Sequence, residues 1–393
     1  MRDLDRRSTT AVTYTLVRGV VWLPGSSLCT GVLMKTPLYD EHVKLGAKMT
    51  EFAGWEMPLQ YAGIAHEVEV VRTKVGLFDI SHMGQIAVSG PKALQLVQYV
   101  TTNDASALEV GAAQYSLLCD ENGCAIDDLI VYRIGEDAYK LVVNAGNKSG
   151  DYEWIRTHND FGAEVVHRPS EDALIAVQGP QAERVVQSLT KFDLKTLKRF
   201  HITDIVDVAD CECEIMRTGY TGEDGFEISP YAVDLPELWN ALLEAGKEFG
   251  VEPIGLGARD VLRLEAAMPL YGHELSRKTT PVAARLMWVV RPAKGDFIGR
   301  DAILRAKEAG EPRTLRGIEA IDRCIPRHGS DLMNGGAAVG SITSGTFSPT
   351  LGKAIALAYI DNEFSAVGTE LEVMAGSRTC RCKVVPTPFY KRG

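Results

Sequence analysis

Apolar positions along this chain recur at two spacings, one typical of strands and one typical of helices. Short β-branched and aromatic segments that end at turns predict strands over 85–88, 114–119, 126–133 and 139–144. Apolar residues that repeat every three or four positions predict helices over 39–45, 68–74, 235–249 and 257–266. Beyond about residue 300, Gly, Thr and β-branched residues predict a small all-β domain with strands over 336–344, 354–360, 371–374 and 380–385.

The order of these elements predicts an α+β fold. The strands between 114 and 144 follow one another through short turns, which favours an antiparallel meander with helices on one face over alternating βαβ units. A strand, a Gly-Pro pair and a helical pattern occur in this order twice, around 88–93 and 177–182, so we expect two similar α+β layers. No G-x-G-x-x-G or Walker loop is present, and a nucleotide-dependent enzyme is therefore unsupported.

Composition and charge exclude several further classes of protein. The chain of 393 residues carries a formal net charge of −10, so no global basic field indicates a nucleic-acid partner. No apolar run reaches the length needed to span a membrane. The 8 cysteines lack C-x-x-C spacing, so we expect reduced structural thiols in a cytosol-like compartment, and no metal site.

Residues 1–33 differ from the rest of the chain. They are rich in Thr, Ser and Gly, and Met34 with the Lys-Thr-Pro-Leu-Tyr that follows it is typical of a natural start. We interpret 1–33 as a disordered extension or a translation-start artefact and predict a cytoplasmic protein. The alternative is a targeting peptide, which would direct the protein to the mitochondrial matrix.

Two adjacent carboxylates interrupt the predicted strand at 126–133. Successive strand side chains point to opposite faces, so Asp127 and Asp128 are not expected to share a site, and only one of them is expected to be chemical. An ionised carboxylate among apolar neighbours is costly unless a donor satisfies it, which favours a substrate contact. The alternative is a carboxylate that caps a nearby turn. The turn before this strand contains Asn122-Gly123, a pair typical of hairpins.

A second stretch combines glycines with a carboxylate on a strand. Glu227 lies between two apolar residues after three glycines in seven positions, where it could accept two parallel hydrogen bonds from a planar heterocycle, or simply face water. Arg259 and Arg263 lie one helical turn apart and repel each other unless an anion sits between them. Asp260 and Glu265 could supply part of that charge and an anionic ligand the rest. His82 has no nucleophile in a recognisable motif near it, so we interpret it as a satisfied core or turn residue.

Seven collinear motifs carry a family resemblance over roughly residues 34–391. They are TPLYDEH at 36, FAGW at 52, FDISHMG at 78, IDDLIV at 126, GYTGEDGFEI at 219, ARDVLRLEA at 258 and SGTFSPTLGK at 344. Together they resemble the aminomethyltransferases, the T proteins of the glycine cleavage system. The resemblance implies three domains around a tetrahydrofolate hole. It implies that residues 34–290 form two α+β subdomains, the second inserted at about 86–169, and that residues 300–391 form a β-barrel or jelly roll.

The resemblance also implies roles for individual residues. Asp128 matches the catalytic carboxylate of the family, and Glu227 matches the residue that holds the pterin. The remaining positions match the lining of the folate site, and they are Tyr115, Asn144, Tyr220 and Arg259, with Met83 and Phe200 as apolar neighbours. The family's aromatic residue near the carboxyl end aligns with either Phe389 or Tyr390.

The implied reaction moves the carbon of an aminomethyl group from the lipoyl arm of the H protein to tetrahydrofolate, releasing ammonia and giving 5,10-methylenetetrahydrofolate. The alternatives are a tetrahydrofolate-dependent demethylase of the same fold and a folate-binding regulator without catalysis. Because the chain is acidic overall, docking of an acidic H protein would need a local cationic patch. We predict this patch at Arg285, Arg291, Lys294 and Arg300, with Lys353 near a second loop.

Overall fold

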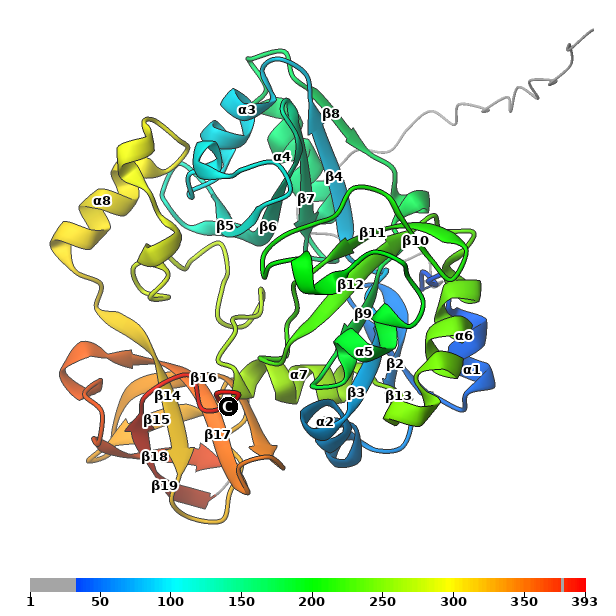
Figure 1. Cartoon of the computed structure of the whole chain (residues 1–393). Coiled ribbons are helices and arrows are strands. Elements are labelled where there is room, and N and C mark those ends of the chain that lie inside the picture. The colour runs from blue at the N-terminus through cyan, green and yellow to red at the C-terminus, as the bar shows by residue number, and fades with distance from the viewer. Residues whose placement is uncertain (1–32, 376–377) are drawn as a thin grey trace, which may run out of the picture. The chain divides into compact units, whose positions relative to one another are not determined.

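The computed structural model describes residues 33–375 and 378–393, and residues 34–393 form one compact unit. The prediction for residues 1–33 lies outside the described residues, except for Leu33. A hairpin of β1 (Lys48–Phe52) and β2 (Trp55–Gln60) follows the first helix, α1 (Tyr39–Lys44). The mixed α and β architecture expected from the sequence is confirmed (Figure 1).

The first large sheet has six strands in the order β10-β11-β12-β9-β3-β13. All neighbours are antiparallel except β13 and β3. The strands are β3 (Val75–Asp79), β9 (Ile175–Gln178), β10 (Val206–Val208), β11 (Cys211–Met216), β12 (Gly225–Pro230) and β13 (Val251–Pro253). The helices packed on it are α2 (Ile64–Thr73), α5 (Ala182–Gln187), α6 (Leu235–Ala245) and α7 (Leu256–Glu265).

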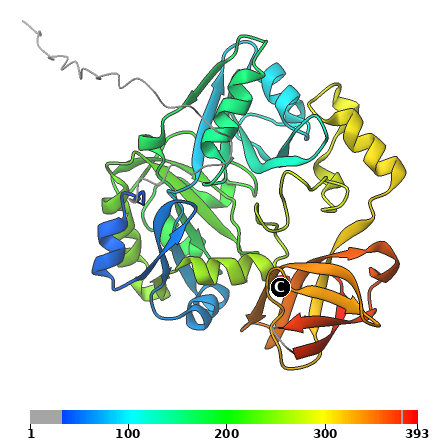
Figure 2. The ribbon, with the colours of Figure 1, turned by 180° about the vertical axis from the view of Figure 1, so that it is seen from behind.

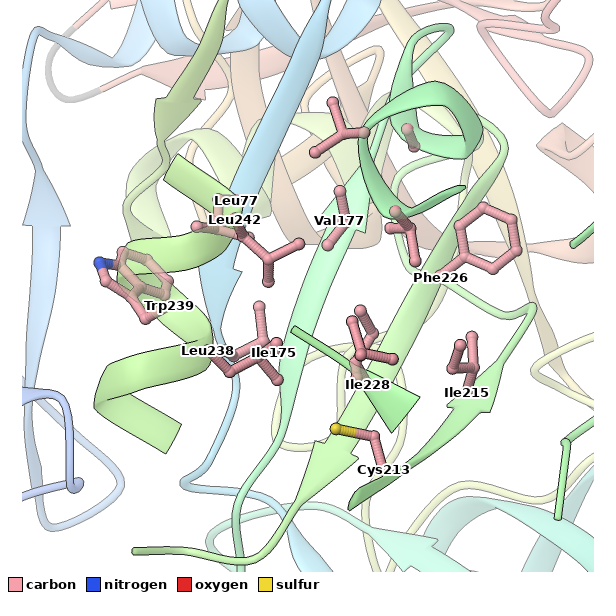
Figure 3. Close-up of a cluster of buried hydrophobic side chains, with 14 of the residues drawn as sticks. Leu77, Ile175, Val177, Cys213, Ile215, Phe226, Ile228, Leu238, Trp239 and Leu242 are labelled. Atoms are coloured by element: carbon pink, nitrogen blue, oxygen red, sulfur yellow. The ribbon is translucent and has the colours of Figure 1, made fainter. Parts of the chain in front are cut away.

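The two faces of this sheet bury different helices, because the side chains of its strands alternate. Leu77, Val177 and Phe226 point to one face and pack against α5 and α6, where Trp239 is fully buried (Figure 3). The neighbouring residue Phe78 points to the other face and packs with α2 and α7. This second face also carries Glu227 toward the other sheet, because Glu227 lies between two residues of the first face.

The second sheet has five strands in the order β5-β6-β7-β4-β8, all antiparallel. Its strands are β4 (Gly84–Ser89), β5 (Ala113–Cys119), β6 (Ala125–Gly135), β7 (Ala138–Val143) and β8 (Glu164–His167). The apolar faces of its strands pack against α3 (Ala93–Val100) and α4 (Lys148–Thr157). The predicted meander is confirmed by the pairing of β5, β6 and β7. The turn at Asn122-Gly123 joins β5 to β6, with Gly123 at φ 76°.

The last part of the chain closes into a six-stranded barrel in the order β14-β17-β16-β15-β18-β19, preceded by α8 (Arg300–Ala309) (Figure 2). Its strands are β14 (Arg313–Ala320), β15 (Asp331–Asn334), β16 (Ala337–Ser348), β17 (Lys353–Asp361), β18 (Glu370–Ala375) and β19 (Arg378–Val385). The predicted all-β domain is confirmed, although the sequence pattern did not identify β14 and β15. Leu264 of α7 packs against Ile355 and Leu357 of β17, which ties the barrel to the first sheet's helices.

One predicted helix has a different extent in the structure. The helix predicted over 235–249 is α6 followed by a separate 3₁₀ turn at Lys247–Phe249, and Gly250 ends it in the left-handed conformation. Asp234 occupies the N-cap of α6, but its side chain makes no capping hydrogen bond.

Across the described ranges, no helix is long and apolar enough to cross a bilayer.

Candidate active site

A cavity of about 1030 Å³ lies between the two sheets, α7 and the barrel. Both sheets, the loops that follow α7 and the segment after β19 contribute to its wall. It includes every residue that the resemblance placed at the folate site, namely Met83, Tyr115, Asp128, Asn144, Phe200, Tyr220, Glu227 and Arg259. Residues far apart in the sequence therefore meet at one surface, and the role of each remains a prediction.

Asp128 is half-buried in β6 and lines this cavity. The Tyr115 hydroxyl donates to its Oδ2 at 2.9 Å, and the side-chain amide of Asn144 donates to its Oδ1 at 2.9 Å. Burial, and then the nearby charge of Asp127, raise the pKa of Asp128 from 3.8 to about 7. A carboxyl group with such a pKa can exchange a proton near neutral pH, as a general base must.

The prediction that Asp127 and Asp128 point to opposite faces and do not share a site is confirmed. Their side chains leave β6 on opposite sides, and only Asp128 lines the cavity. However, Asn144 stands at the end of β7, where its amide donates to Asp127 Oδ1 at 2.8 Å as well as to Asp128. The backbone N–H of Asn144 also donates to Asp127, at 3.0 Å. One asparagine therefore links the two carboxyl groups.

Glu227 lies on β12, on the face of the first sheet that borders the cavity. The Thr218 hydroxyl donates to its Oε2 at 2.7 Å, and Thr218 is itself bonded to the hydroxyl of Tyr132. Oε1 accepts no hydrogen bond from the described part of the chain. Burial raises the pKa of Glu227. The carboxylate is thus fixed at one oxygen and retains acceptor capacity at the other.

The two arginines of α7 have different surroundings. Arg263 is fully buried and pairs with Glu274 and Asp260, each at 2.7 Å. Asp260 therefore supplies charge as predicted, whereas Glu265 pairs with Arg72 instead.

Arg259 lies with its guanidinium 4.8 Å from the centre of the Tyr220 ring and makes no ion pair within the described residues. The Tyr220 hydroxyl donates to the carbonyl of Pro269, which fixes the ring under the cation. Arg259 is thus a cation of the cavity wall that is available to an anionic ligand.

Sequence reasoning missed several residues of the cavity wall. Trp288 is 58% exposed and stacks on Tyr115, with ring centroids 5.8 Å apart and an angle of 25° between the planes. The sequence gave no signal for Trp288, because its stacking partner Tyr115 is remote in the chain.

His82 also lines the cavity. It is buried as predicted, but its Nδ1 has no hydrogen-bond partner among the described residues. Burial, and then Arg259, lower the pKa of His82 to about 3, so the ring is neutral.

The carboxyl-terminal aromatic residues do not line the cavity. Phe389 packs with Leu264 in the cluster that joins α7 to the barrel. The ring of Tyr390 lies 3.9 Å from the Arg72 guanidinium, whereas Thr387 and Pro388 line the cavity instead. The sequence left open whether Phe389 or Tyr390 lines the folate site. In this structure neither residue lines the cavity.

Comparisons with known proteins agree with this architecture. A model of the GCVT N-terminal domain matches residues 38–294, and a model of the glycine cleavage T-protein C-terminal barrel domain matches residues 313–391. The aminomethyltransferase of Symbiobacterium thermophilum is 52% identical over 91% of this chain and 98% of its own length. The chain belongs to the aminomethyltransferase family of glycine cleavage T proteins.

Other members of the family support the same assignment. The aminomethyltransferase of Geobacillus thermodenitrificans is 49% identical over 92% of this chain and 99% of its own length. The crystal structure of glycine cleavage system aminomethyltransferase T from Bartonella henselae superposes with a TM-score of 0.86 at 36% identity, covering 92% of this chain and 99% of that one. The resemblance seen in the sequence motifs is confirmed, and the chain is a transferase of the glycine cleavage system. Nothing in these comparisons favours the demethylase or the regulator.

One residue of the predicted cationic patch does not fit an aminomethyltransferase docking surface. The ammonium of Lys294 donates to the backbone carbonyls of Gln98, Thr101 and Asn103. Burial lowers the pKa of Lys294 to about 7. Lys294 therefore anchors the 3₁₀ segment Pro292–Lys294 to the end of α3, and it does not present a charge to a partner.

Proposed function

We propose that the cavity binds tetrahydrofolate and that Asp128 acts as the catalytic carboxylate in transfer of the aminomethyl carbon to it. The donor is the lipoyl arm of the H protein, which carries the carbon as a thioaminal, and the products are ammonia and 5,10-methylenetetrahydrofolate. The observation that carries this proposal is that Asp128 and Glu227, from different sheets, line one cavity together with Arg259.

The chemistry of the cavity wall fits a folate. The accepting oxygen of Glu227 suits the parallel N–H donors of a 2-amino-4-oxo pterin ring. Tyr115 and Trp288 offer flat aromatic faces, and Met83 and Phe200 offer apolar contacts to a ring system. Arg259 supplies a cation for an anionic part of the ligand, such as a carboxylate.

The residues around Asp128 suit the proton transfers of this reaction. Tetrahydrofolate supplies the nucleophilic nitrogen that receives the carbon. Tyr115 and Asn144 hold the Asp128 carboxylate in place, which keeps it aimed into the cavity. Ionised Asp128 stabilises positive charge that develops on a neighbouring nitrogen and accepts its proton.

The H protein must reach the cavity from the surface. Without Lys294, the predicted patch retains Arg285 and Arg291, which are exposed, and Arg300, which bonds to Asp301. Arg285 lines the cavity wall, so a partner bound there would lie next to the opening. We propose Arg285 and Arg291 as the contacts for the H protein. Lys353 pairs with Glu319 of the barrel and is a weaker candidate.

A single reconstitution tests the function. The purified chain is mixed with tetrahydrofolate and aminomethyl-loaded H protein, and ammonia and 5,10-methylenetetrahydrofolate are measured together. We expect the two products in equal amounts and no activity with H protein that lacks the lipoyl group. Formation of a methylated folate from a methyl donor would support the demethylase. Binding of tetrahydrofolate with neither reaction would support the regulator.

A further inference from the structure

A third carboxyl group lies behind Asp127 and has no place in the reaction described above. Asp151 is in the first turn of α4 and has no solvent exposure. Neither of its oxygens accepts a hydrogen bond from any donor in the described residues. Asp127 is the carboxyl group next to it: Asn147, one helical turn before Asp151 on α4, donates to Asp127 Oδ1 at 2.8 Å, and a hydrogen bond between the two carboxyl groups contributes to the raised pKa of Asp151.

This contact requires a proton. Two carboxylates cannot hydrogen-bond to each other unless one of them carries a hydrogen, and a buried ionised carboxylate without a donor is costly. Among the described residues, no cation forms an ion pair with either carboxyl group. Lys148, on the same helix, is bound to Asp172 at 2.9 Å, and Arg277 is exposed to solvent.

The hydrogen bonds around the pair show which carboxyl group holds the proton. Asp127 accepts three hydrogen bonds, two from Asn144 and one from the side-chain amide of Asn147 at 2.8 Å. Three donors suit an anion. Asp151 receives none, which suits a neutral acid that donates. Burial, and then the charge of Asp127, raise the pKa of Asp151 to about 11.

The pair reaches the catalytic carboxylate through one side chain. The Asn144 amide that donates to Asp127 also donates to Asp128, so the position of the Asp127 anion fixes the direction of that amide. The charge of Asp127 also contributes to the raised pKa of Asp128. A change at Asp151 would therefore reach Asp128 through Asp127 and Asn144, although Asp151 is not in the cavity wall.

We propose that Asp151 is a positioning residue that stays protonated, donates its proton to Asp127 in a hydrogen bond, and thereby holds the Asn144 amide against Asp128. The catalytic part of this proposal rests on the proposed role of Asp128. The protonation of Asp151 does not, and it can be measured without turnover.

Other charged and titratable groups face this network from the elements packed around it. They are Tyr115 of β5, Lys148 of α4, and Tyr271 and Arg277 of the loop after α7. Tyr115, Lys148 and Tyr271 hydrogen-bond to Asp128, Asp172 and the carbonyl of Ala125, so a change confined to position 151 removes none of these bonds.

The first experiment measures protonation directly by infrared difference spectroscopy between the full-length chain and its variants, at about pH 8.5, above the pKa of Asp128. We expect a carboxylic-acid carbonyl band in the parent protein that is lost in Asp151→Asn and retained in Asp128→Asn. Absence of any such band that the change at 151 removes would overturn the proposal. If Asp151→Asn does not fold, Asp151→Val replaces it and should lose the same band, because only the carboxyl group at 151 is removed.

The second experiment compares two substitutions at 151 by turnover. Asp151→Asn retains an N–H donor to Asp127, and we expect its kcat within about threefold of the parent. Asp151→Val has similar bulk but no donor, and we expect kcat to fall about tenfold or more, with the KM for tetrahydrofolate changed less than about threefold. Equal kcat in the two variants, or a fall in both kcat and KM together, would contradict a positioning role. An inactive parent protein would refute the proposed function and leave the infrared result standing.

Discussion

At the scale of single residues, the chemistry of this site depends on how neighbouring carboxyl groups are separated. Asp127 and Asp128 are adjacent in β6, yet only Asp128 reaches the cavity. Their shared partner Asn144 keeps both satisfied without bringing them into direct contact. Two like charges placed this close raise each other's pKa, and burial adds to the effect. The strand thus prepares one of its two carboxyl groups for proton exchange near pH 7.

The first residue-scale prediction concerns the charge of Asp128. Asp128→Asn preserves size and keeps an acceptor for Tyr115, so tetrahydrofolate binding should persist. Turnover should fall at least ~10²-fold, because a positioned general base contributes about that much. Stopped-flow turnover and calorimetric titration of tetrahydrofolate would measure the two effects. Asp160→Asn, at an exposed position, is the matched control and should keep full activity. Near-parent turnover in Asp128→Asn would refute the assignment.

The second residue-scale prediction concerns pH. Asp128 must be ionised to accept a proton, and burial together with Asp127 raises its pKa to about 7. The ionised fraction therefore grows as pH rises, so kcat should increase between about pH 6 and pH 8 and then level off. In Asp127→Asn the charge that helps to raise this pKa is gone, and the acidic limb should move to lower pH. A kcat profile measured at saturating substrates that is flat across this range would argue against Asp128 as the base.

At the scale of secondary-structure elements, the repeated Gly-Pro junctions show that similar sequence can occupy different surroundings. Gly90 lies before α3 and Gly179 before α5, and both have positive φ, at 98° and 130°. A Cβ at Gly90 would meet nothing within 4 Å. A Cβ at Gly179 would lie 2.6 Å from the carbonyl oxygen of Lys74 and 2.7 Å from that of Val71, at the end of α2. The second junction therefore needs glycine for close packing as well as for conformation.

This difference gives a paired prediction. Gly90→Ala should cost about 1 kcal/mol of stability, because the positive φ disfavours a side chain. Gly179→Ala should cost at least about 2 kcal/mol more, because rigid backbone atoms must move to admit the methyl group. Urea unfolding of both variants, followed by tryptophan fluorescence, would measure the difference. Equal unfolding midpoints would show that the end of α2 yields easily at Gly179.

At the scale of the whole described unit, one buried ion pair and its hydrogen bonds join α7 to the barrel. Arg263 binds Glu274 at 2.7 Å, and its other nitrogen donates to the hydroxyl of Ser344 in β16 at 2.7 Å. Glu274 also accepts from the hydroxyl of Thr343 in β16. These groups lie under the cavity wall, so the barrel's attachment and the shape of the cavity depend on the same contacts.

The whole-molecule prediction tests this attachment. Arg263→Met leaves Glu274 as a fully buried charge without its cation, and loss of one partner of a buried pair costs about 3 to 5 kcal/mol. Arg313→Met breaks the exposed pair with Asp361 and should cost less than about 1 kcal/mol. Thermal unfolding of the two variants at one pH and salt concentration would compare them. A similar small loss in both would mean that water or rearrangement satisfies Glu274.

The sequence by itself determined most of the elements and the family of this chain. Local spacing of apolar residues predicted the meander of β5, β6 and β7, because the alternation of side chains in a strand is a property of the backbone. The same reasoning placed α7 within one residue of each of its ends. Seven motifs indicated the family and, through it, eight of the residues that line the cavity. The exact domain boundaries and the role of residues 1–33 remain predictions.

Only the tertiary structure decided which charged groups are free and which are satisfied. Lys294 was predicted to meet a partner protein but is anchored by three backbone carbonyls. Arg263, for which the sequence left a carboxylate or a ligand open, is paired with Asp260 and Glu274. Asp151 gave no signal in the sequence, since it lies in an ordinary amphipathic helix. Burial and hydrogen-bond partners come from segments remote in the chain, and the cost of an unpaired charge depends on both. Local sequence patterns therefore place a carboxyl group on an element, whereas packing of that element decides its protonation.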